Sequence, residues 1–308
     1  MSVHKQHSGD RVPVTLPRLA EMKFGAEPIV MVTAYDHPSA QVAEAAGVDI
    51  VLVGDSAAMT VLGYDSTVPV GMEQMLMLAA AVRRGLQTPL LIGDMPFGSY
   101  EGSNEQAVEN AQRFVKEAGC DAVKLERGGA SVDRARAIVR AGIPVMGHVG
   151  LTPQSAASLG GFKAQAKTAK RAVEVAEDAL ALQSVGCFSV VFEAMPAEVT
   201  AALMSRMSLA TVIGIGAGPA TDGQVLVFHD LLGISDGRAP KFVKRFAEVR
   251  EEMVRGVAAY ADEVRSRAFP APEHLYAIDP AELEAFRSYL ERESRSDTFG
   301  GDWAATEI

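Results

Sequence analysis

The sequence is poor in cysteine and tryptophan, and it contains no long apolar run. Its 2 cysteines, Cys120 and Cys187, are too few for a disulfide framework and lack metal-ligand spacing, so we interpret both as small buried side chains. No run approaches the ~18 to 20 apolar residues of a membrane span. Residues 1–16 are polar and lack the apolar centre of a signal peptide. We therefore expect a cytoplasmic protein with no membrane partner.

Positive charge is also scarce. The chain has 29 Lys and Arg against 39 Asp and Glu, a formal net charge of −10, and no basic cluster interleaved with aromatic residues. It thus lacks the electrostatic footprint of a nucleic-acid-binding protein, and small molecules are the expected partners. A hydrophobic content of 48% in 308 residues is typical of a globular protein with a large core.

Short apolar runs alternate along the chain with segments of helical periodicity. The runs that we interpret as strands are residues 29–33, 50–53, 90–93, 122–125, 144–147, 189–192, 212–215 and 225–228. Helical periodicity is clearest in residues 16–24, 39–46, 104–118, 132–141 and 168–184. Strands that alternate with helices are typical of parallel strands joined by crossovers. Eight of them predict an α/β fold, a (β/α)8 TIM barrel.

An internal repeat supports the barrel more strongly than periodicity does. Residues 47–55, 119–126 and 186–193 each run from a glycine that would end a helix, through a strand, to an acid. Residues 85–94 follow the same plan with one more residue, whereas residues 142–148 end in histidine. An acid after a strand can simply cap the next helix. Acids at the same position of four units favour a common site, because the carboxyl ends of barrel strands form the active-site face.

The strand that runs into Glu126 illustrates the chemistry of this face. Lys124 and Glu126 lie two residues apart, so both point to the same side of the strand. Burying both charges is costly unless they pair with each other or bind a ligand. If the barrel forms, the side chains that converge with them at one mouth are Asp55, Asp94, His148 and Glu193.

Crowded carboxylates repel one another, so we expect a cation among them. Hard oxygen ligands favour Mg²⁺, which takes one or two carboxylates directly and keeps its other positions for water and substrate oxygens. Zinc is disfavoured because the chain has no His/Cys cluster. A 2-oxo acid would chelate such a metal beside a lysine, which acidifies the C–H next to the carbonyl. A nearby carboxylate could then remove that proton. The residues alone predict metal-assisted enolate chemistry and leave open what the enolate attacks.

Two long loops follow the second and fifth predicted strands, at residues 56–74 and 149–168. Loops of this length are usually functional. The second loop contains several glycines and a proline, a composition suited to a mobile cover over a site. The GIGAG segment at residues 214–218 has the composition of a phosphate cradle, but an oxo acid carries no phosphate. We therefore interpret it as close backbone packing or a folate contact.

Several segments together resemble the ketopantoate hydroxymethyltransferase family. They lie in order over roughly residues 15 to 270 and read VTAYD, VGDSAAMTVLGYDSTVPV, GDMPF, VKLERGG, GHVGLTPQS, FEAMP and GIGAGPATDGQVLVFHD. The resemblance implies a barrel of the phosphoenolpyruvate/pyruvate type. It also implies transfer of a one-carbon unit from 5,10-methylenetetrahydrofolate to 3-methyl-2-oxobutanoate with Mg²⁺, giving 2-dehydropantoate in pantothenate biosynthesis. A homo-oligomer such as a decamer is implied as well.

The resemblance also implies roles for individual residues. In GDS and GDMPF, Asp55 and Asp94 would bind both metal and substrate, and Ser56 would contact the substrate carboxylate. In the VKLERGG segment, Lys124 would bind the substrate and Glu126 would be a third metal-site carboxylate. Glu193 in FEAMP would be the proton acceptor. His148 is a further candidate substrate contact, with a structural histidine as the alternative. The departures from the family pattern at Ala57, Ala58 and Arg127 remove none of these side chains.

We expect residues 1–275 to form the barrel domain with an N-terminal arm. Residues 276–308 would form a C-terminal helix and a loose tail, and residues 240–260 would form a further helix. Two alternative functions stay open. One is a Mg-dependent carbon–carbon lyase acting on a 2-oxo acid in the same barrel superfamily. The other is a non-catalytic barrel that binds a small acid, which would not need Glu193.

Overall fold

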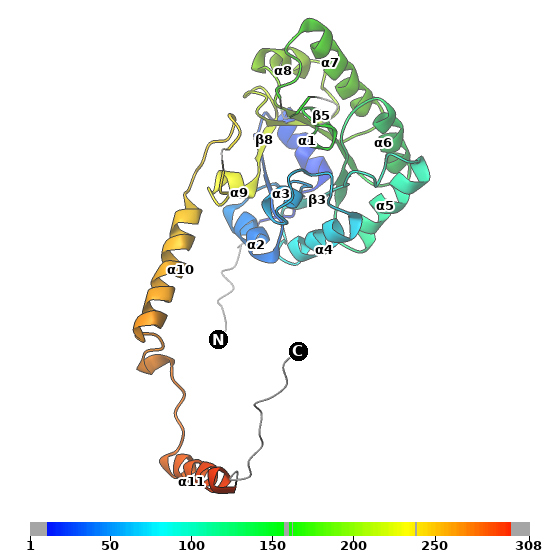
Figure 1. The fold of residues 1–308 in the computed structure, drawn as a ribbon. Coiled ribbons are helices and arrows are strands. Elements are labelled where there is room, and N and C mark those ends of the chain that lie inside the picture. The colour runs from blue at the N-terminus through cyan, green and yellow to red at the C-terminus, as the bar shows by residue number, and fades with distance from the viewer. Residues whose placement is uncertain (1–10, 157–159, 162, 238, 297–308) are drawn as a thin grey trace, which may run out of the picture. The chain divides into compact units, whose positions relative to one another are not determined.

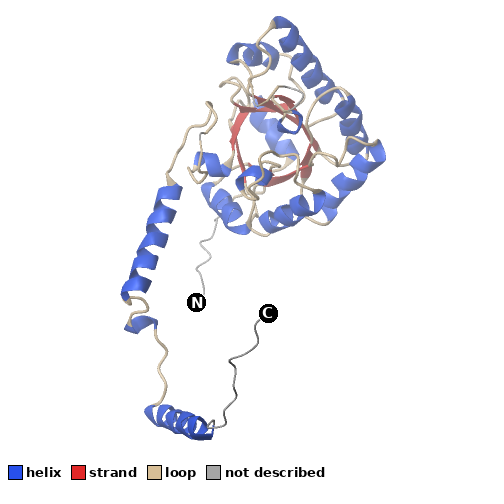
Figure 2. Ribbon diagram, in the orientation of Figure 1, coloured by secondary structure: helices blue, strands red, loops and turns tan. Residues whose placement is uncertain are grey.

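The structure, a computed structural model, describes residues 11–156, 160–161, 163–237 and 239–296. Its centre is a closed barrel of parallel strands that follow one another in sequence order from β1 to β8. Helices surround the ring of strands, as the red and blue ribbons in Figure 2 show. The predicted (β/α)8 barrel is therefore confirmed.

All the predicted strands are present, with small shifts at their ends. They are β1 Ile29–Thr33, β2 Ile50–Val53, β3 Leu90–Asp94, β4 Ala122–Lys124, β5 Val145–Gly150, β6 Ser189–Glu193, β7 Thr211–Ile215 and β8 Gly223–Leu226. The strand β8, which was predicted at residues 225–228, begins and ends two residues earlier, and β5 ends three residues later than predicted. Gly223 pairs with Ile29 of β1, so the strand starts early. The Phe228 amide donates to the Thr33 hydroxyl at 2.9 Å, which turns the chain out of the sheet.

The helices of the barrel unit surround the ring of strands, except that α1 and α3 lie over the ring itself (Figure 1). They are α1 Leu16–Phe24, α2 His37–Ala46, α3 Ala57–Thr60, α4 Met72–Arg83, α5 Asn104–Lys116, α6 Ala130–Arg140, α7 Ala169–Ser184, α8 Ala197–Met204 and α9 Phe228–Leu231, with a 3₁₀ turn η1 at Pro153–Ser155. Local chemistry sets their ends. For α2, the Asp36 carboxylate caps the first turn, and Gly47 ends the helix at a φ of 77°.

The core has two layers. Inside the barrel, inward side chains such as Ile92, Met146 and Ile213 form one apolar cluster with Leu19 and Met22 of α1. Outward side chains of the same strands pack with the surrounding helices in a second cluster. This alternation is what parallel strands covered on both faces require. It leaves polar side chains at the carboxyl ends of the strands, where apolar packing stops.

A second compact unit, Glu251–Ile308, follows the first, Met1–Arg250. Helix α10, Val249–Ser266, begins two residues before this unit, which also contains α11 Pro280–Ser296 and a 3₁₀ turn η2 at Pro272–His274. The predicted helix at residues 240–260 was wrong in its first half. The Phe246 and Val249 amides bond the carbonyls of Leu231 and Leu232, so residues 240–248 follow α9 as an irregular segment. The predicted division near residue 275 stays a prediction.

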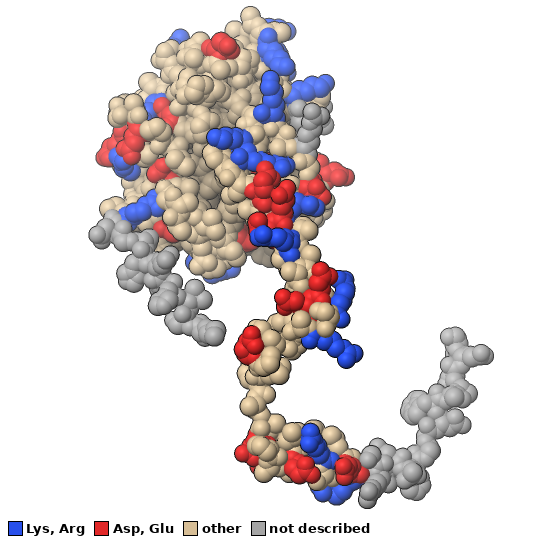
Figure 3. Space-filling view, turned by 90° about the vertical axis from the view of Figure 1, so that its left-hand side faces the viewer, with Lys and Arg blue, Asp and Glu red and all other residues tan. Residues whose placement is uncertain are grey.

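The surface carries charges of both signs. On the face in Figure 3, basic and acidic side chains lie next to one another on the barrel unit and on the later helices. Elsewhere on the surface, several ion pairs join residues one helical turn apart, such as Arg113–Glu117. Pairs of this kind contribute only a few tenths of a kcal/mol, roughly 0.3–0.5. Among the described helices, none is long and apolar enough to cross a membrane.

Candidate active site

A buried ion-pair network lies at the carboxyl ends of β3 and β4. Asp94 and Lys124 face each other across these strands, and Lys124 Nζ donates to the two Asp94 oxygens at 2.7 and 2.9 Å. The Glu126 carboxylate is 3.4 Å from the same ammonium. All three residues are at most 3% exposed. The strand alternation that the sequence predicted therefore brings these charges to one side.

Asp55 joins the network from the end of β2. Its backbone amide donates to Asp94 Oδ2 at 3.1 Å, and its own Oδ2 accepts a hydrogen bond from Gln154 Nε2 at 3.0 Å. Gln154 also donates its backbone amide to Glu126 Oε2 at 3.1 Å. Tyr100 donates its hydroxyl to Gln154 Oε1 at 2.5 Å. One glutamine of the loop after β5 thus ties together acids from two strands.

His148 lies between two glutamates. Its Nδ1 is 3.2 Å from Glu126 Oε1, and its Nε2 is 3.1 Å from Glu193 Oε2. Nε2 is buried and makes no well-angled hydrogen bond to any described residue, so the contact with Glu193 is a close charge pair rather than an aligned bond. Both the predicted substrate contact and the structural alternative are compatible with this position.

Burial and mutual repulsion shift the pKa values of the acids. Burial, with Asp94 and Glu126 close by, raises the pKa of Asp55 well above its usual value. Burial also raises the pKa of Asp94. Burial acts in the same direction on Glu126, but Lys124 and the His148 hydrogen bond outweigh it, so the pKa of Glu126 is lowered.

The basic groups of the network hold their protons. Burial alone would lower the pKa of Lys124, but Asp94, Glu126 and Asp55 together raise it. Burial and Lys124 oppose protonation of His148, yet its two glutamate partners raise its pKa to about 9. Asp55 has no cationic side chain of its own within ion-pair distance among the described residues. A cation bound next to Asp55 would stabilise its charged form and so lower its raised pKa.

These carboxylates suit a hard cation that takes few protein ligands. No group of three or more His, Cys, Asp and Glu side chains in the described part of the chain is already arranged as a metal cage. Mg²⁺ does not need one, because it binds through one or two carboxylates and completes its shell with water and substrate oxygens. The raised pKa of Asp55 and the purely oxygen donor set therefore fit Mg²⁺ better than zinc.

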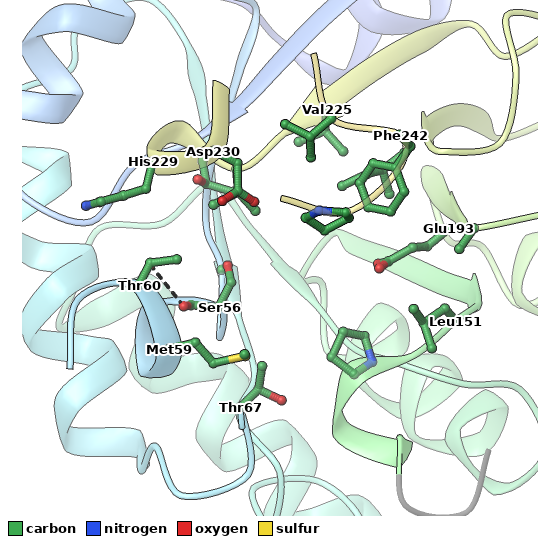
Figure 4. Close-up of a pocket in the computed structure, with 18 of the residues that line it drawn as sticks. Ser56, Met59, Thr60, Thr67, Leu151, Glu193, Val225, His229, Asp230 and Phe242 are labelled. Atoms are coloured by element: carbon green, nitrogen blue, oxygen red, sulfur yellow. Dashed lines mark hydrogen bonds between the residues drawn. The ribbon is translucent and has the colours of Figure 1, made fainter. Parts of the chain in front are cut away.

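A cavity of about 650 Å³ opens above the network. Every site residue predicted from the sequence lines it: Asp55, Ser56, Asp94, Lys124, Glu126, His148 and Glu193. Figure 4 shows Ser56 and Glu193 on different walls, with Asp230 and Phe242 completing the side formed after β8. The Ser56 hydroxyl is fixed by a 2.8 Å hydrogen bond with Tyr35.

Sequence reasoning missed Gln154 and Tyr100. Both lie in segments without regular periodicity, so no pattern indicated which way their side chains point. The only available signal was that Gln154 belongs to the GHVGLTPQS segment, which was noted for its histidine.

Comparisons with known proteins identify related sequences over most of the chain. A model of the family described as ketopantoate hydroxymethyltransferase matches residues 13–272. The chain is 52% identical over 266 residues to a 3-methyl-2-oxobutanoate hydroxymethyltransferase of Moorella thermoacetica, covering 86% of this chain and 98% of that one. It is 50% identical over 286 residues to the mitochondrial 3-methyl-2-oxobutanoate hydroxymethyltransferase 1 of Arabidopsis thaliana, covering 91% and 82%.

Solved structures with the same fold are more distant in sequence. A phosphonopyruvate hydrolase in complex with oxalate and Mg²⁺ superposes with a TM-score of 0.56 at 12% identity, covering 92% of this chain and 99% of that one. At this identity the likeness shows the fold alone, which is the closed eight-stranded parallel barrel.

Proposed function

Because the chain belongs to the ketopantoate hydroxymethyltransferase family, and is therefore a hydroxymethyltransferase of pantothenate synthesis, we propose that its donor is 5,10-methylenetetrahydrofolate and its acceptor 3-methyl-2-oxobutanoate. The product is 2-dehydropantoate. The observation that carries the proposal is one cavity in which three buried carboxylates and a buried lysine lie beside the carboxylate of Glu193.

The buried charges bind the oxo acid. Lys124 and the Ser56 hydroxyl offer donors to the substrate's carboxylate and carbonyl oxygens. Asp55 and Asp94, with Glu126 beside them, would hold Mg²⁺. When bound, this ion polarises the substrate carbonyl and acidifies the hydrogen on C3. The phosphonopyruvate hydrolase with the same fold binds oxalate and Mg²⁺, which supports this arrangement by analogy of fold.

Glu193 acts as the base. Its side chain is 14% exposed and borders the cavity, so a carboxylate oxygen can reach a substrate there. The proton moves from C3 to this oxygen, and the electron pair of the broken C–H bond shifts into the enolate. Water adds to the methylene carbon of the donor as its bonds to N10 and N5 break, which releases tetrahydrofolate and leaves the carbon at the oxidation level of formaldehyde. The enolate carbon attacks this carbon to form the carbon–carbon bond, and its oxygen takes up the proton that Glu193 received, giving the hydroxymethyl group. His148 holds Glu193 in place from the buried side.

Two measurements test this function. Proton NMR of 3-methyl-2-oxobutanoate in D₂O follows deuterium entry at C3, which we expect only with protein and Mg²⁺ together. Product formation with 5,10-methylenetetrahydrofolate then separates a transferase from a lyase or a binding protein. Exchange without folate-dependent product would contradict the transfer, and cleavage of the oxo acid would favour the lyase.

The cysteines disfavour the lyase alternative. We expect a lyase of that type to place a cysteine or a charged gating loop at the mouth of the barrel. Cys120 and Cys187 are buried just before β4 and β6, at the opposite end of the strands from the cavity. Burial raises the pKa of each thiol to about 12, so neither is a ready nucleophile.

Gln154→Ala should weaken metal binding. It removes the side-chain donor to Asp55 and the acceptor of Tyr100, while the backbone bond to Glu126 remains. Loss of such outer hydrogen bonds typically lowers metal affinity about 10- to 100-fold. Titration with Mn²⁺ followed by electron paramagnetic resonance measures this directly. Gln165→Ala is the matched control, because among the described residues its side chain bonds a carbonyl of its own loop and no acid of the network. Equal Mn²⁺ affinity in both variants would remove Gln154 from the metal site.

The homo-oligomer is a further proposal. No side chain of α10 is buried, and Met253, Val257, Tyr260 and Val264 recur on it at helical spacing with exposed fractions of 44–69%. Such a stripe supports association with another copy of the chain. Sedimentation velocity of the whole protein gives the number of copies, and a monomer would contradict the proposal. Residence in the cytoplasm stays a prediction.

A further inference from the structure

The cavity is larger than the acceptor needs. Sites of about 300–1,000 Å³ accommodate ligands of drug size, and 650 Å³ falls within this range. A five-carbon oxo acid beside the carboxylate network fills only the deep part. The remaining wall is formed after β8, by α9 and the irregular segment that follows it. None of its side chains is used by the chemistry described above.

Asp230 places a carboxylate on this wall. It lies in α9, partly buried, and Figure 4 shows its side chain pointing into the cavity. Burial raises its pKa, while the Ser235 hydroxyl, His229 and Arg245 act in the opposite direction. A carboxylate accepts about four hydrogen bonds. The bond to Ser235 therefore leaves acceptor capacity directed at a ligand.

Phe242 supplies a flat apolar surface on the same wall. Its ring lies against Gly216, where a Cβ atom would come within 2.6 Å of Phe242 Cδ1. Gly216 also has a φ of 62°, which disfavours any side chain there. The GIGAG segment thus packs its backbone closely against another part of the chain, which is one of the two interpretations of its sequence. This packing positions an aromatic ring next to the cavity. Figure 4 shows Phe242 and Asp230 on the same side of the pocket.

A carboxylate and an aromatic ring on the same wall of a cavity match one part of a reduced folate. The pterin is flat, and its 2-amino group and N3–H form a pair of adjacent donors. Such a pair binds a carboxylate through two parallel hydrogen bonds, as a guanidinium does. The ring face stacks on an aromatic side chain. The one-carbon unit bridges N5, on the other ring of the pterin, and N10, just outside that ring, so a pterin anchored here can direct that carbon into the cavity.

We propose that Asp230 binds the amino-pyrimidine edge of the tetrahydropterin and that Phe242 packs on its face. This inference rests on the proposed function, because it takes the folate donor as given. It assigns the wall after β8 to the donor and the carboxylate network to the acceptor. The enolate then forms between them, next to Glu193.

Asp230→Asn is the sharpest test, because asparagine keeps the shape and can still accept a bond from Ser235. The side-chain NH₂ of asparagine would face the N–H donors of the pterin, and two donors cannot form a hydrogen bond. A lost charged hydrogen bond costs ~1.5–3 kcal/mol, which is about 10- to 150-fold in affinity. We expect the Kd of tetrahydrofolate, measured calorimetrically without oxo acid, and the KM of the methylene donor to rise by that factor. Deuterium exchange at C3, which uses no folate, should change less than about twofold.

Two controls complete the experiment. Asp236→Asn removes an acid from the same segment, where Asp236 pairs with Arg250 at 2.7 Å, and should leave folate affinity unaltered. A 2-desamino-2-methyl tetrahydrofolate should bind the unsubstituted protein weakly and be indifferent to Asp230→Asn. Phe242→Leu should weaken tetrahydrofolate binding independently of Asp230.

The outcomes are separable. Unchanged tetrahydrofolate affinity in Asp230→Asn, with folate-dependent turnover intact, would overturn the inference and leave the function standing. Equal loss of exchange and of folate binding would also overturn it, because Asp230 would then serve the acceptor or the fold. Absence of folate-dependent product in the unsubstituted protein, with exchange intact, would instead overturn the proposed function.

Discussion

Glu193→Gln should slow deuterium exchange at C3 of 3-methyl-2-oxobutanoate by about 10²- to 10⁴-fold, the usual contribution of a positioned general base. The substitution changes the volume little, but an amide cannot take up the proton at neutral pH. Binding of the oxo acid should persist, because Lys124 and Ser56 are untouched. NMR in D₂O measures exchange, and calorimetry measures affinity for the oxo acid in the presence of Mg²⁺.

Glu198→Gln is the matched control for this variant. Glu198 lies five positions further on, exposed in the first turn of α8, and does not line the cavity. The Glu198→Gln variant should exchange deuterium at the same rate as the unsubstituted protein. If Glu193→Gln exchanged deuterium within about threefold of the rate of the unsubstituted protein, Glu193 would not be the base. Either another group removes the proton, or the alternative of a non-catalytic barrel that binds a small acid is favoured.

The strands and their charged ends were predictable because two physical patterns coincide there. Buried parallel strands leave apolar runs, and the glycine before each run marks the end of a helix. Once Asp55, Asp94, Glu126 and Glu193 occupy the same place in the repeat, the closed barrel brings them to one mouth. The structure confirms that convergence, and even the pair of Lys124 with an acid. The partner is chiefly Asp94 of the neighbouring strand rather than Glu126.

The rest of the site depends on loops whose course no periodicity encodes. Gln154 reaches Asp55 across 99 positions of sequence because the loop after β5 folds back over the mouth. Phe242 was placed in a predicted helix, yet main-chain bonds from the segment after it to α9 hold the chain in an irregular path. Tertiary hydrogen bonds override a helical pattern in such segments, so their side chains cannot be oriented from sequence alone.

Lys124→Met should be the most destabilising of the substitutions considered, at about 3–5 kcal/mol of unfolding free energy near neutral pH, because it removes one partner from a buried ion pair. Lys124 is 3% exposed, and its ammonium lies 2.7 Å from Asp94. Methionine fills nearly the same volume, so packing is largely kept. The loss therefore reports charge. Urea unfolding measures it, with Lys167→Met, at an exposed position, as the control.

The pH dependence of this penalty separates charge from packing. Without Lys124, the pKa values of Asp94 and Asp55 in the folded state rise further above those of the unfolded chain. Acids of this kind fold more favourably when protonated, so the penalty should shrink as the pH falls and grow as it rises through the raised pKa values. If Lys124→Met lowered the unfolding free energy equally at about pH 5.5 and about pH 8, the loss would come from poor packing of the methionine rather than from the missing charge.

Mg²⁺ should reduce the difference in unfolding free energy between Lys124→Met and the unsubstituted protein. An ion among the acids replaces the positive charge that the substitution removes. A ligand that binds only the folded state stabilises it by ~2.7 kcal/mol at one hundred times its Kd. The variant, with one competing cation fewer, should gain more from Mg²⁺ than the unsubstituted protein does, yet still bind the oxo acid poorly. Equal gains in both proteins would place the ion away from Asp94. If Mg²⁺ stabilises the variant more than the unsubstituted protein and the variant binds the oxo acid poorly, the roles within the network are as proposed. The carboxylates then bind the metal, and the lysine binds the substrate.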